Sequence, residues 1–330
     1  MNKIGISIIG TGNIGHKRAK NLPKSLEIIS CFDIDKKQRE QFATDFNCIA
    51  CSSIEEVLNN NDVAAVIIST QHDTLSEITI QSVIADKHVL VEKPAGLNSD
   101  QIQNIINHQK KSKKVVSVGF NHRYHPSIIK AREIISEGRL GEIMFIRGRY
   151  GHGGRVGYDR EWRSFPEKGG GELLDQGPHL IDISRLILGD FIDTTGFINT
   201  YFWDMSVDDN AFMILKTKEE KCAFLHVSCT EWKNMFSLEV YGKIGKLDIK
   251  GLGGSYGVEE ITHYEMQPEM GPPPSHKWTF DEKDKSWSKE LDDFVYNIQN
   301  ENSECPTLYD ALAVHKVIED LKKNTKYDNY

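Results

Sequence analysis

The first third of the chain alternates short apolar runs with longer stretches of mixed character. A short apolar run is typical of a strand buried on both faces, and the mixed stretches between the runs are typical of helices. Strands that alternate with helices predict a parallel, doubly wound sheet, which binds ligands beyond the carboxyl ends of its strands. We expect strands at residues 4–9, 27–32, 64–68, 88–91 and 115–118, and helices at residues 16–22, 74–85 and 99–110.

A glycine-rich turn directly follows the first expected strand. Its residues, Gly10-Thr11-Gly12-Asn13-Ile14-Gly15, have the G-x-G-x-x-G spacing of a dinucleotide-binding loop. Gly10 permits the tight turn, Gly12 lets the backbone approach a pyrophosphate, and Gly15 lets the helix pack close to the strand. The pyrophosphate would lie on the positive N-terminus of that helix. The spacing predicts that this loop, including Asn13 and Ile14, binds a nicotinamide dinucleotide.

Asp33 ends the second expected strand, 18 residues after Gly15. A carboxylate at about this distance accepts hydrogen bonds from both ribose hydroxyls and repels a 2′-phosphate, which favours NAD over NADP. Lys36 and Lys37 lie just downstream and soften that preference, so NADP stays possible. The alternative for Asp33 is a solvated residue that begins a turn.

The loops after the next two strands are expected to line the same cofactor. One begins with Ser69 and Thr70, and the other begins with Glu92-Lys93-Pro94. Pro94 fixes the backbone and biases Lys93 toward an extended conformation, which would hold the ammonium group toward the ligand. The alternative is an exposed loop lysine, the commonest fate of this residue type.

A second candidate site lies at residues 169–182, where three glycines precede a helical pattern. Glycines let a backbone pass close to a ligand. If the helix continues through Gly177 and Pro178, Asp175 and His179 lie one turn apart on the same face. A carboxylate so placed orients the imidazole and raises its basicity, as a general acid–base requires. The alternative is a helix N-terminal aspartate and a partly buried structural histidine.

Length and charge narrow the class of protein. The chain has 330 residues, enough for two domains, and a formal net charge of −8. Nucleic acids and anionic membranes need clustered lysine and arginine, so neither is an expected partner. No apolar run approaches the roughly 20 residues that span a bilayer, and the N-terminal segment predicts a strand rather than a signal peptide, so we expect a cytoplasmic protein.

Cys48 and Cys51 are interpreted as small hydrophobic residues, because no second pair completes a zinc site, and no metal is expected.

Four motifs follow one another along the chain: GTGNIG at 10–15, EKP at 92–94, GFNHRYHP at 119–126 and GGGELLDQGPHLID at 169–182. Together they resemble the Gfo/Idh/MocA family, the glucose–fructose oxidoreductase and inositol dehydrogenase group, over nearly the whole chain. The resemblance implies an NAD-binding Rossmann domain at residues 1–121. It also implies an α+β substrate and oligomerisation domain with a large, mostly antiparallel open sheet at residues 122–330.

The second half has a pattern that fits this implied sheet. Its strands are expected at residues 143–150, 196–204, 210–216, 221–231, 235–241 and 245–250, where apolar and polar residues alternate. Such sheets pack face to face between subunits in the family, which implies a homodimer or homotetramer. A C-terminal helix at residues 308–322 is implied to fold back against the first domain.

The resemblance assigns roles residue by residue. Lys93, Asp175 and His179 match the family's catalytic lysine, aspartate and histidine, and they are also implied to contact the substrate. Four further residues are implied to line the nicotinamide or the substrate pocket: Asn121, Arg123, Trp162 and Arg163.

Two segments stand out from the family pattern. Where the family commonly has T-P-x-x-x-H, residues 70–75 read TQHDTL, which puts the adenosine-side loop in doubt but not the chemistry. Residues 149–155 are rich in Gly, His and Arg and are interpreted as a substrate loop in which Tyr150 and Arg155 contact the substrate. Arginine binds phosphate or carboxylate through paired hydrogen bonds, which suits a phosphorylated or nucleotide-linked sugar. The alternative is an ordinary mobile loop.

These features predict an enzyme that transfers a hydride between a secondary alcohol of a sugar and NAD. Either His179 or Lys93 takes the hydroxyl proton, and Asp175 orients one of the two. The preferred substrate is a nucleotide-linked or phosphorylated hexose of cell-surface sugar biosynthesis, and a free sugar or inositol is the near alternative. Two other classes stay open: a redox-neutral NAD-dependent glycosidase, and an NAD(P)-sensing protein without catalysis.

Overall fold

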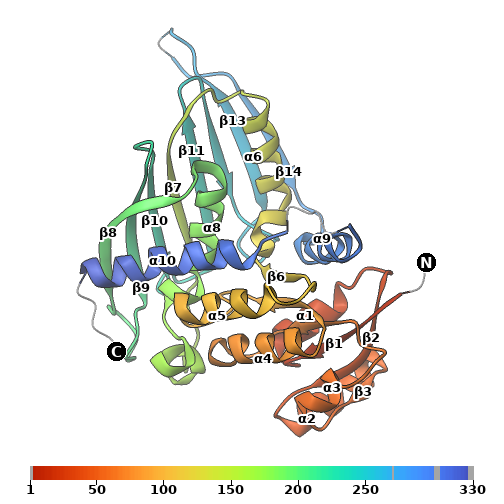
Figure 1. The fold of residues 1–330 in the computed structure, drawn as a ribbon. Helices are drawn as coiled ribbons and strands as arrows, with labels where there is room; N and C mark the ends of the chain where they lie inside the picture. The colour runs from red at the N-terminus through yellow and green to blue at the C-terminus, as the bar shows by residue number, and fades with distance from the viewer. Residues whose placement is uncertain (1–2, 270, 301–304, 326–330) are drawn as a thin grey trace. The chain divides into compact units, whose positions relative to one another are not determined.

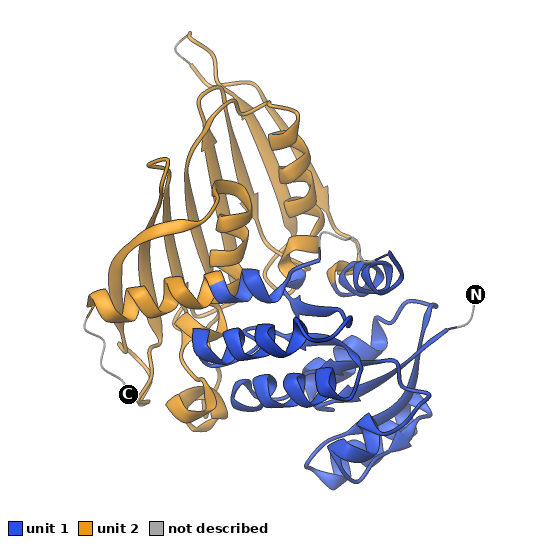
Figure 2. Ribbon diagram, viewed as in Figure 1, with its two compact units in different colours: residues 1–121, 287–312 blue, residues 122–286, 313–330 orange. Residues whose placement is uncertain are grey.

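The computed structural model describes residues 3–269, 271–300 and 305–325, so residues 326–330 of the expected second domain lie outside the described part of the chain. The chain divides into two units (Figure 2). The first contains residues 1–121 and 287–312, and the second contains residues 122–286 and 313–330. The first unit therefore includes a segment from near the C-terminus as well as the N-terminal third of the chain.

The first unit is built on a six-stranded sheet with the strand order β3-β2-β1-β4-β5-β6 (Figure 1). Every neighbouring pair of these strands is parallel. The chain order reverses between β1 and β4, which is the switch point where doubly wound sheets bind ligands. The predicted doubly wound sheet is thereby confirmed. Its strands are β1 (Ile4–Ile9), β2 (Leu26–Phe32), β3 (Ile49–Ala50), β4 (Ala65–Ile68), β5 (His88–Glu92) and β6 (Val116–Gly119).

Side-chain caps set several helix ends in the first unit. Asp35 accepts hydrogen bonds from the backbone N–H groups of Lys37 and Gln38 and so begins α2, and Asn47, with φ of 52°, ends it. Ser53 caps α3 through the N–H of Glu56. The helices are α1 (Asn13–Lys20), α2 (Lys36–Phe46), α3 (Ile54–Leu58), α4 (His72–Ile84), α5 (Ser99–Gln109) and α9 (Ser286–Asn300). The sequence did not predict α2, β3, α3 or α9.

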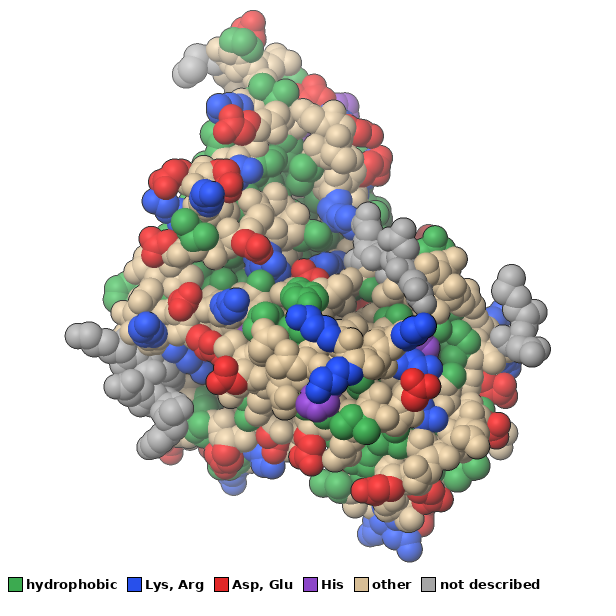
Figure 3. All heavy atoms as spheres, viewed as in Figure 1, with side chains coloured by type: hydrophobic (Ala, Val, Ile, Leu, Met, Phe, Trp, Pro, Cys, Tyr) green, Lys and Arg blue, Asp and Glu red, His purple; other side chains and the backbone are tan. Residues whose placement is uncertain are grey.

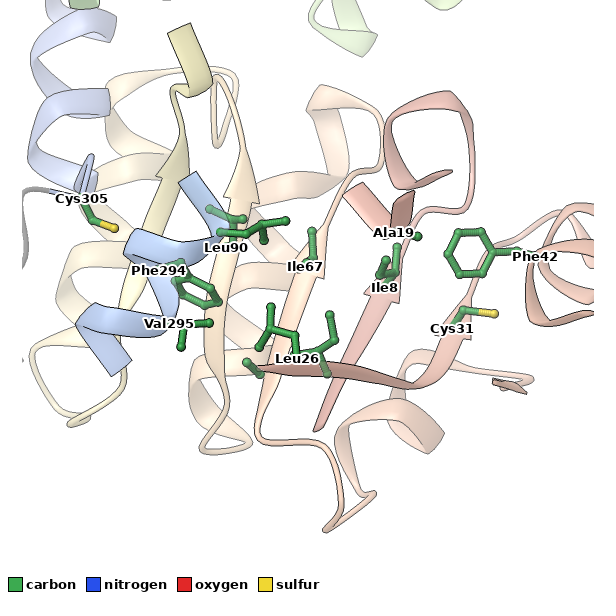
Figure 4. Close-up of a cluster of buried hydrophobic side chains, with 13 residues drawn as sticks. Ile8, Ala19, Leu26, Cys31, Phe42, Ile67, Leu90, Phe294, Val295 and Cys305 are labelled. Atoms are coloured by element: carbon green, nitrogen blue, oxygen red, sulfur yellow. The ribbon is translucent and has the colours of Figure 1, made fainter. Parts of the chain in front are cut away.

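Helix α9 contributes to the hydrophobic core of the six-stranded sheet. Phe294 and Val295 belong to the same buried cluster as Ile67 and Leu90 from the central strands (Figure 4). The chain after α9 also pairs with the edge of the sheet, because the N–H of Val118 donates to the carbonyl of residue 306 at 2.9 Å. The first unit therefore buries side chains from both ends of the sequence in one core.

A buried ion cluster joins α1, β5 and α9. Arg18 is fully buried, and its Nε donates to Glu92 Oε1 at 2.6 Å while its Nη1 donates to Glu290 Oε2. The Trp287 ring covers the guanidinium, 4.5 Å away. Gly119 leaves room for the cluster, because a Cβ there would lie 2.8 Å from Arg18 Nη2. One arginine thus holds together the helix after the glycine loop, the strand before Lys93 and the C-terminal segment.

Two carboxylates on one guanidinium leave a net negative charge in the interior. Burial raises the pKa of Glu290 to about 7, although Arg18 opposes the shift. Burial alone would lower the pKa of Arg18, but attraction by Glu290 and Glu92 outweighs it and raises that pKa. The arginine therefore stays charged, and Glu290 is the member of the cluster that takes up a proton near neutrality.

The second unit is built on an eight-stranded sheet with the order β14-β13-β12-β11-β7-β10-β9-β8. Its neighbouring strands are antiparallel except for the parallel pair β7–β10, which confirms the predicted mostly antiparallel open sheet. The strand expected at 196–204 lies instead at 191–199, and β13 and β14 were not predicted. The strands are β7 (Ile143–Gly151), β8 (Phe191–Asn199), β9 (Asn210–Thr217), β10 (Cys222–Ser228), β11 (Met235–Gly242), β12 (Gly245–Lys250), β13 (Glu259–Glu265) and β14 (Ser275–Phe280).

Helices cover one face of this sheet (Figure 1). Gly148 on β7 lets α8 come close, because a Cβ there would lie 3.0 Å from both Leu180 and Leu225. On the opposite face, Phe197, Ile214 and Phe224 are between 43% and 71% exposed. The helices of the remaining chain are α6 (Pro126–Ser136), α7 (Glu172–Asp175), α8 (Gly177–Leu188) and α10 (Leu308–Thr325), which crosses from the first unit into the second.

Surface charge and the apolar character of the helices bear on two classes of partner, nucleic acids and membranes. Acidic and basic side chains intermingle over the face drawn in Figure 3, instead of gathering into a basic surface of the kind that binds nucleic acid. Among the helices of the described residues, none has both the length and the apolar character needed to cross a bilayer.

We predict that Glu290→Gln makes stability less dependent on pH. The folded chain keeps a proton on Glu290 up to about pH 7, whereas an unfolded glutamate loses it near 4.5, so stability is lost as the pH rises through 7. Between pH 5 and pH 8 the free energy of unfolding of the wild type should fall by about 2 to 3 kcal/mol more than that of the variant. Urea unfolding followed by circular dichroism measures the free energy of unfolding of the wild type and of the variant at each pH. Glu77→Gln, on the exposed side of α4, is the control and should follow the wild type, and equal pH dependence in Glu290→Gln would contradict the assignment.

Candidate active site

The glycine loop has the geometry that its sequence predicts. Gly10 has φ of 94°, and a Cβ on Gly15 would lie 2.1 Å from the Gly10 carbonyl oxygen. A Cβ on Gly12 would meet nothing within 4 Å, so the chain leaves open space beside this residue. Ser69 Oγ donates to the Gly10 carbonyl at 2.7 Å and thereby helps to shape the turn. The open side at Gly12 is where the backbone can approach a pyrophosphate.

The start of α1 is suited to an anion. Gly12 precedes the helix and provides no side-chain acceptor for the N–H groups of the first turn. Asn13 and Ile14 open the helix, and Ile14 is 37% exposed. The N–H groups and the helix dipole therefore favour a negative ligand at this end.

Asp33 is held next to the glycine loop. Its Oδ2 accepts hydrogen bonds from Thr11 N at 2.7 Å and from Thr11 Oγ1 at 3.2 Å. Its Oδ1 accepts a hydrogen bond from Asp35 N at 2.9 Å, so the carboxylate is fixed in orientation instead of turning freely in solvent. Spacing alone did not identify Thr11 as the residue that joins the two predicted cofactor motifs.

Lys93 is half-buried at the carboxyl end of β5, between the buried residues Glu92 and Pro94. The Lys93–Pro94 peptide bond is cis. Glu92 was expected to line the cofactor, and its carboxylate accepts hydrogen bonds from Arg18 in the buried cluster. Thr70 Oγ1, in the loop after β4, accepts a hydrogen bond from Thr74 Oγ1 at 2.8 Å. The family pattern has a proline at the next position, where this chain has Gln71.

Asp175 and His179 belong to two helices that are almost continuous. Gln176 joins α7 to α8 with helical backbone angles of −94° and −32°. Pro178 has no N–H to donate to the preceding turn, which explains the interruption at this point. The preceding glycines are needed because other parts of the chain come close to them. A Cβ on Gly170 would lie 2.2 Å from the Arg163 carbonyl oxygen, and a Cβ on Gly171 would lie 2.3 Å from Asp208 Oδ1.

Arg163 fixes the carboxylate of Asp175. Arg163 Nε donates to Asp175 Oδ2 at 2.9 Å, and Asp175 is only 2% exposed. The guanidinium lies over the Trp162 ring, 4.4 Å from its centre, in the 3₁₀ helix η3 (Trp162–Ser164). Burial lowers the pKa of Arg163, but the attraction of Asp175 outweighs it and raises that pKa. The structure thus brings the predicted pair Trp162 and Arg163 to the predicted catalytic residue Asp175.

His179 stacks on a histidine that the sequence did not single out. The rings of His122 and His179 lie 3.8 Å apart with 13° between their planes. His122 belongs to the 3₁₀ helix η1 (Asn121–Tyr124), which begins at the predicted cofactor residue Asn121. Both histidines are 6% exposed. The stack keeps the His179 ring in one plane.

The neighbouring Arg123 is occupied by an acid of α8. Its Nε donates to Asp182 Oδ2 at 2.7 Å and its Nη2 donates to Asp182 Oδ1, and both side chains are buried. This paired ion contact ties η1 to α8 at the position of the histidine stack. Arg123 was predicted to bind substrate, and its guanidinium is bound to this aspartate.

Two tyrosines, the buried Tyr150 and the half-buried Tyr256, lie in the surroundings of Asp175. The rings of Tyr150 and Tyr256 lie 5.0 Å apart. Burial is the main cause that raises the pKa of each phenol, so both stay protonated in the physiological range. Tyr150 was predicted to contact substrate. Tyr256 was not, and its only signal in the sequence is its place in the glycine-rich segment 251–257.

The arginines of the expected substrate loop are paired with acids. Arg155 Nε and Nη2 donate to the two carboxylate oxygens of Glu161 at 2.7 and 2.6 Å. Arg149 Nη2 donates to Glu231 at 3.1 Å. Within the described residues, no group of three or more His, Cys, Asp or Glu side chains is arranged to hold a metal ion.

Comparisons with known families match both halves of the chain. Residues 4–120 match the model described as the oxidoreductase family, NAD-binding Rossmann fold, and residues 128–248 match the GFO/IDH/MocA C-terminal domain. Inositol 2-dehydrogenase of Rhizobium meliloti (strain 1021) is 23% identical over 323 residues, which cover 94% of this chain and 93% of that protein. Glucose-6-phosphate 3-dehydrogenase of Bacillus subtilis (strain 168) is 25% identical over 341 residues, which cover 97% and 95%.

Solved structures agree in fold. Levoglucosan dehydrogenase in complex with NADH has a TM-score of 0.89 and 18% identity to this chain, and the match covers 99% of this chain and 98% of that one. The family, the fold and the NAD cofactor expected from the sequence are confirmed. The chain belongs to the Gfo/Idh/MocA family, and it is an oxidoreductase acting on CH–OH groups whose first unit is an NAD-binding Rossmann domain.

Proposed function

We propose that this protein oxidises a secondary alcohol of an uncharged sugar or cyclitol with NAD. The observation that carries the substrate class is the pairing of the candidate substrate arginines with acids of the chain. Arg123 is held by Asp182 and Arg155 by Glu161, and the predicted cofactor residue Arg163 is held by Asp175. A guanidinium paired in this way has its charge balanced, so a hydroxyl-rich neutral ligand suits these groups better than a phosphate.

The nucleotide-linked or phosphorylated hexose is the second candidate. It is favoured by the concentration of arginine in residues 149–155 and by the name of the Bacillus relative, a glucose-6-phosphate dehydrogenase. Arg155 is 63% exposed, and exposed ion pairs contribute only about 0–1 kcal/mol, so a phosphate would compete with Glu161 at little cost. The inositol relatives favour the neutral substrate.

The oxidation separates into a proton transfer and a hydride transfer. The imidazole of His179 takes the proton from the substrate hydroxyl, and the stack on His122 holds its ring for that transfer. The Lys93 ammonium donates a hydrogen bond to the same oxygen as it becomes a carbonyl. NAD, held by the glycine loop and Asp33, would supply the acceptor for the hydride that leaves the carbinol carbon. Asp175, fixed by Arg163, supplies a negative charge that favours a cation on either base.

Asp33 sets the preference for NAD over NADP in this proposal. Its carboxylate is oriented by Thr11 and Asp35 and would offer only acceptors to the ribose hydroxyls. A 2′-phosphate would meet that negative charge and would need a neighbouring cation.

We also infer that the chain forms a homodimer or homotetramer through the open face of the eight-stranded sheet. Phe197, Ile214 and Phe224 lie on this face in neighbouring strands, and Thr195 and Phe224 both pair with Ile214. Large apolar side chains in adjacent positions mark a contact surface more often than scattered single ones do.

The substrate class is tested by absorbance of NADH after the protein and NAD are mixed with myo-inositol, free hexoses, hexose 6-phosphates and nucleotide sugars. We expect a continuing rise with a neutral sugar or cyclitol and a much smaller rise with NADP in place of NAD. Turnover only with the phosphorylated compounds would replace the neutral substrate by the second candidate. Release of a sugar from a glycoside without net NADH would identify the redox-neutral glycosidase, and NADH binding without turnover of any compound would favour the sensor.

His179→Ala should lower kcat by about 10² to 10⁴, because the hydroxyl proton loses its acceptor. NADH binding, followed by fluorescence, should stay within twofold of the wild type. The control is His276→Ala, which removes a histidine with a 57% exposed side chain from β14 and should leave kcat unchanged. Wild-type turnover in His179→Ala would rule out the acid–base role.

Phe224→Asp should dissociate the assembly, because the open face would then bury an unpaired carboxylate. Sedimentation velocity at micromolar concentration should show the mass of one chain for this variant and a multiple of it for the wild type. Ile84→Asp changes an apolar residue of α4 that is 68% exposed, and it should sediment like the wild type. If Phe224→Asp and wild type sediment alike, the open face is not the contact surface.

A further inference from the structure

The His122–His179 stack has an electrostatic consequence beyond holding the ring of His179. Parallel imidazole rings 3.8 Å apart are in direct contact, and both side chains are removed from solvent. A proton on each ring would place two positive charges at this separation with little water between them. The pair therefore accepts one proton far more readily than two, and it titrates as a unit.

A third histidine lies against the outer side of the stack. The His125 ring meets the His122 ring at 5.4 Å with 74° between their planes. His125 Nδ1 lies 3.1 Å from Glu259 Oε2, and both side chains are nearly fully buried. Burial raises the pKa of Glu259, but its hydrogen bonds from His125, Ser127 and Gly253 hold that pKa below its ordinary value. Glu259 is therefore an anion held beside His125.

The other contacts of His122 are aromatic. Tyr150 meets its ring at 5.1 Å with 71° between the planes, and Phe236 meets it at 6.3 Å with 88°. These edge contacts, together with the Arg123–Asp182 ion pair on the next residue, fix the ring of His122 in place. His122 is thus a rigid, buried, titratable group whose one face covers His179.

We propose that His122 is a positioning residue that keeps His179 unprotonated, and therefore able to accept the substrate proton, near neutral pH. This inference rests on the proposed role of His179 as the base. His122 acts through like-charge repulsion, since a proton shared with or bound by His122 disfavours one on His179. His122 also acts through stacking, since it holds the acceptor ring in one plane. The His122 ring itself touches neither substrate nor cofactor in this role.

Other charged groups act on His179 and must be kept constant in a test. On α8 itself they are Asp182 and Arg185, and Arg185 pairs with Asp190. On the elements that pack against α8 they are Glu172 and Asp175 of α7, Tyr150 on the facing side of β7, and Arg123 of η1. On β10 the residues that face α8 are Ala223, Leu225 and Val227, which carry no charge. None of these groups changes when His122 alone is replaced.

The two roles of His122 are separated by two substitutions. His122→Phe keeps a flat ring against His179 but removes the competing proton, whereas His122→Ala removes both. On the acid side of the pH profile, kcat/KM rises to a plateau. In both variants the pH at which kcat/KM reaches half of this plateau should be higher by about one unit. The plateau kcat should stay within about twofold of the wild type in His122→Phe and fall about tenfold in His122→Ala, because only alanine frees the ring.

A measurement on the substrate-free protein keeps this test independent of turnover. The Hε1 resonance of His179, assigned with His179→Ala, should titrate at higher pH in His122→Phe than in the wild type. His226→Phe is the matched control, because His226 stacks on Phe212 at 4.2 Å on the opposite face of the same sheet. This replacement should shift neither the titration of the His179 resonance nor the pH profile of kcat/KM.

The outcomes distinguish this inference from the proposed function. An unchanged titration of His179 and an unchanged pH profile in His122→Phe would overturn the electrostatic role of His122, even if His179→Ala is inactive. Full activity of His179→Ala would instead remove the base, and with it the function that His122 is proposed to support.

Discussion

The buried guanidinium of Arg18 is the interaction on which the cofactor half of this protein depends. A fully buried arginine is costly unless carboxylates and hydrogen bonds replace its lost hydration, and here Glu92 and Glu290 supply them. Because the three residues come from α1, β5 and α9, removing one partner leaves a buried charge that the other cannot fully balance. The path of the glycine loop, the position of Lys93 and the docking of the C-terminal segment are therefore parts of one electrostatic arrangement.

The second unit uses the same principle nearer to the chemistry. Its arginines are paired with acids: Arg163 with Asp175 and Arg123 with Asp182. Each pair ties a 3₁₀ helix to the α7–α8 region, so η1 and η3 present His122 and Trp162 on rigid supports. A group of neutral hydrogen-bonding side chains, including Tyr150 and Tyr256, lies beside these pairs. In the proposed function, such a site would recognise hydroxyl groups by geometry and would not need a net charge to attract its ligand.

The elements that were predicted from the sequence are those whose signal is local. The buried strand at residues 4–9 was predicted with its observed bounds, and the glycine loop was predicted because its spacing reports a backbone shape. Helix α2 was missed because it is polar almost throughout and buries only Phe42. The site residues Asp175, His179 and Arg163 could be nominated, but the ion pair of Arg163 with Asp175 and the stacking of His122 on His179 are tertiary contacts, which spacing cannot reveal. Strand β8 was placed five residues too late, because the apolar residues after it belong to a loop whose backbone N–H groups are bound by the carboxylate of Asp209.

The place of α9 in the first unit has a consequence for how the chain is made. When residues 1–121 have left the ribosome, Arg18 and Glu92 are present, but Glu290 and the Phe294 ring are still to be translated. At about 5–20 residues per second, that interval lasts on the order of ten seconds or more. During this interval, the nascent sheet exposes the apolar surface that α9 later covers. Arg18 then has Glu92 as a carboxylate partner but still lacks Glu290. The vulnerable period of biogenesis therefore ends with synthesis of the C-terminal segment, and not with completion of the six strands.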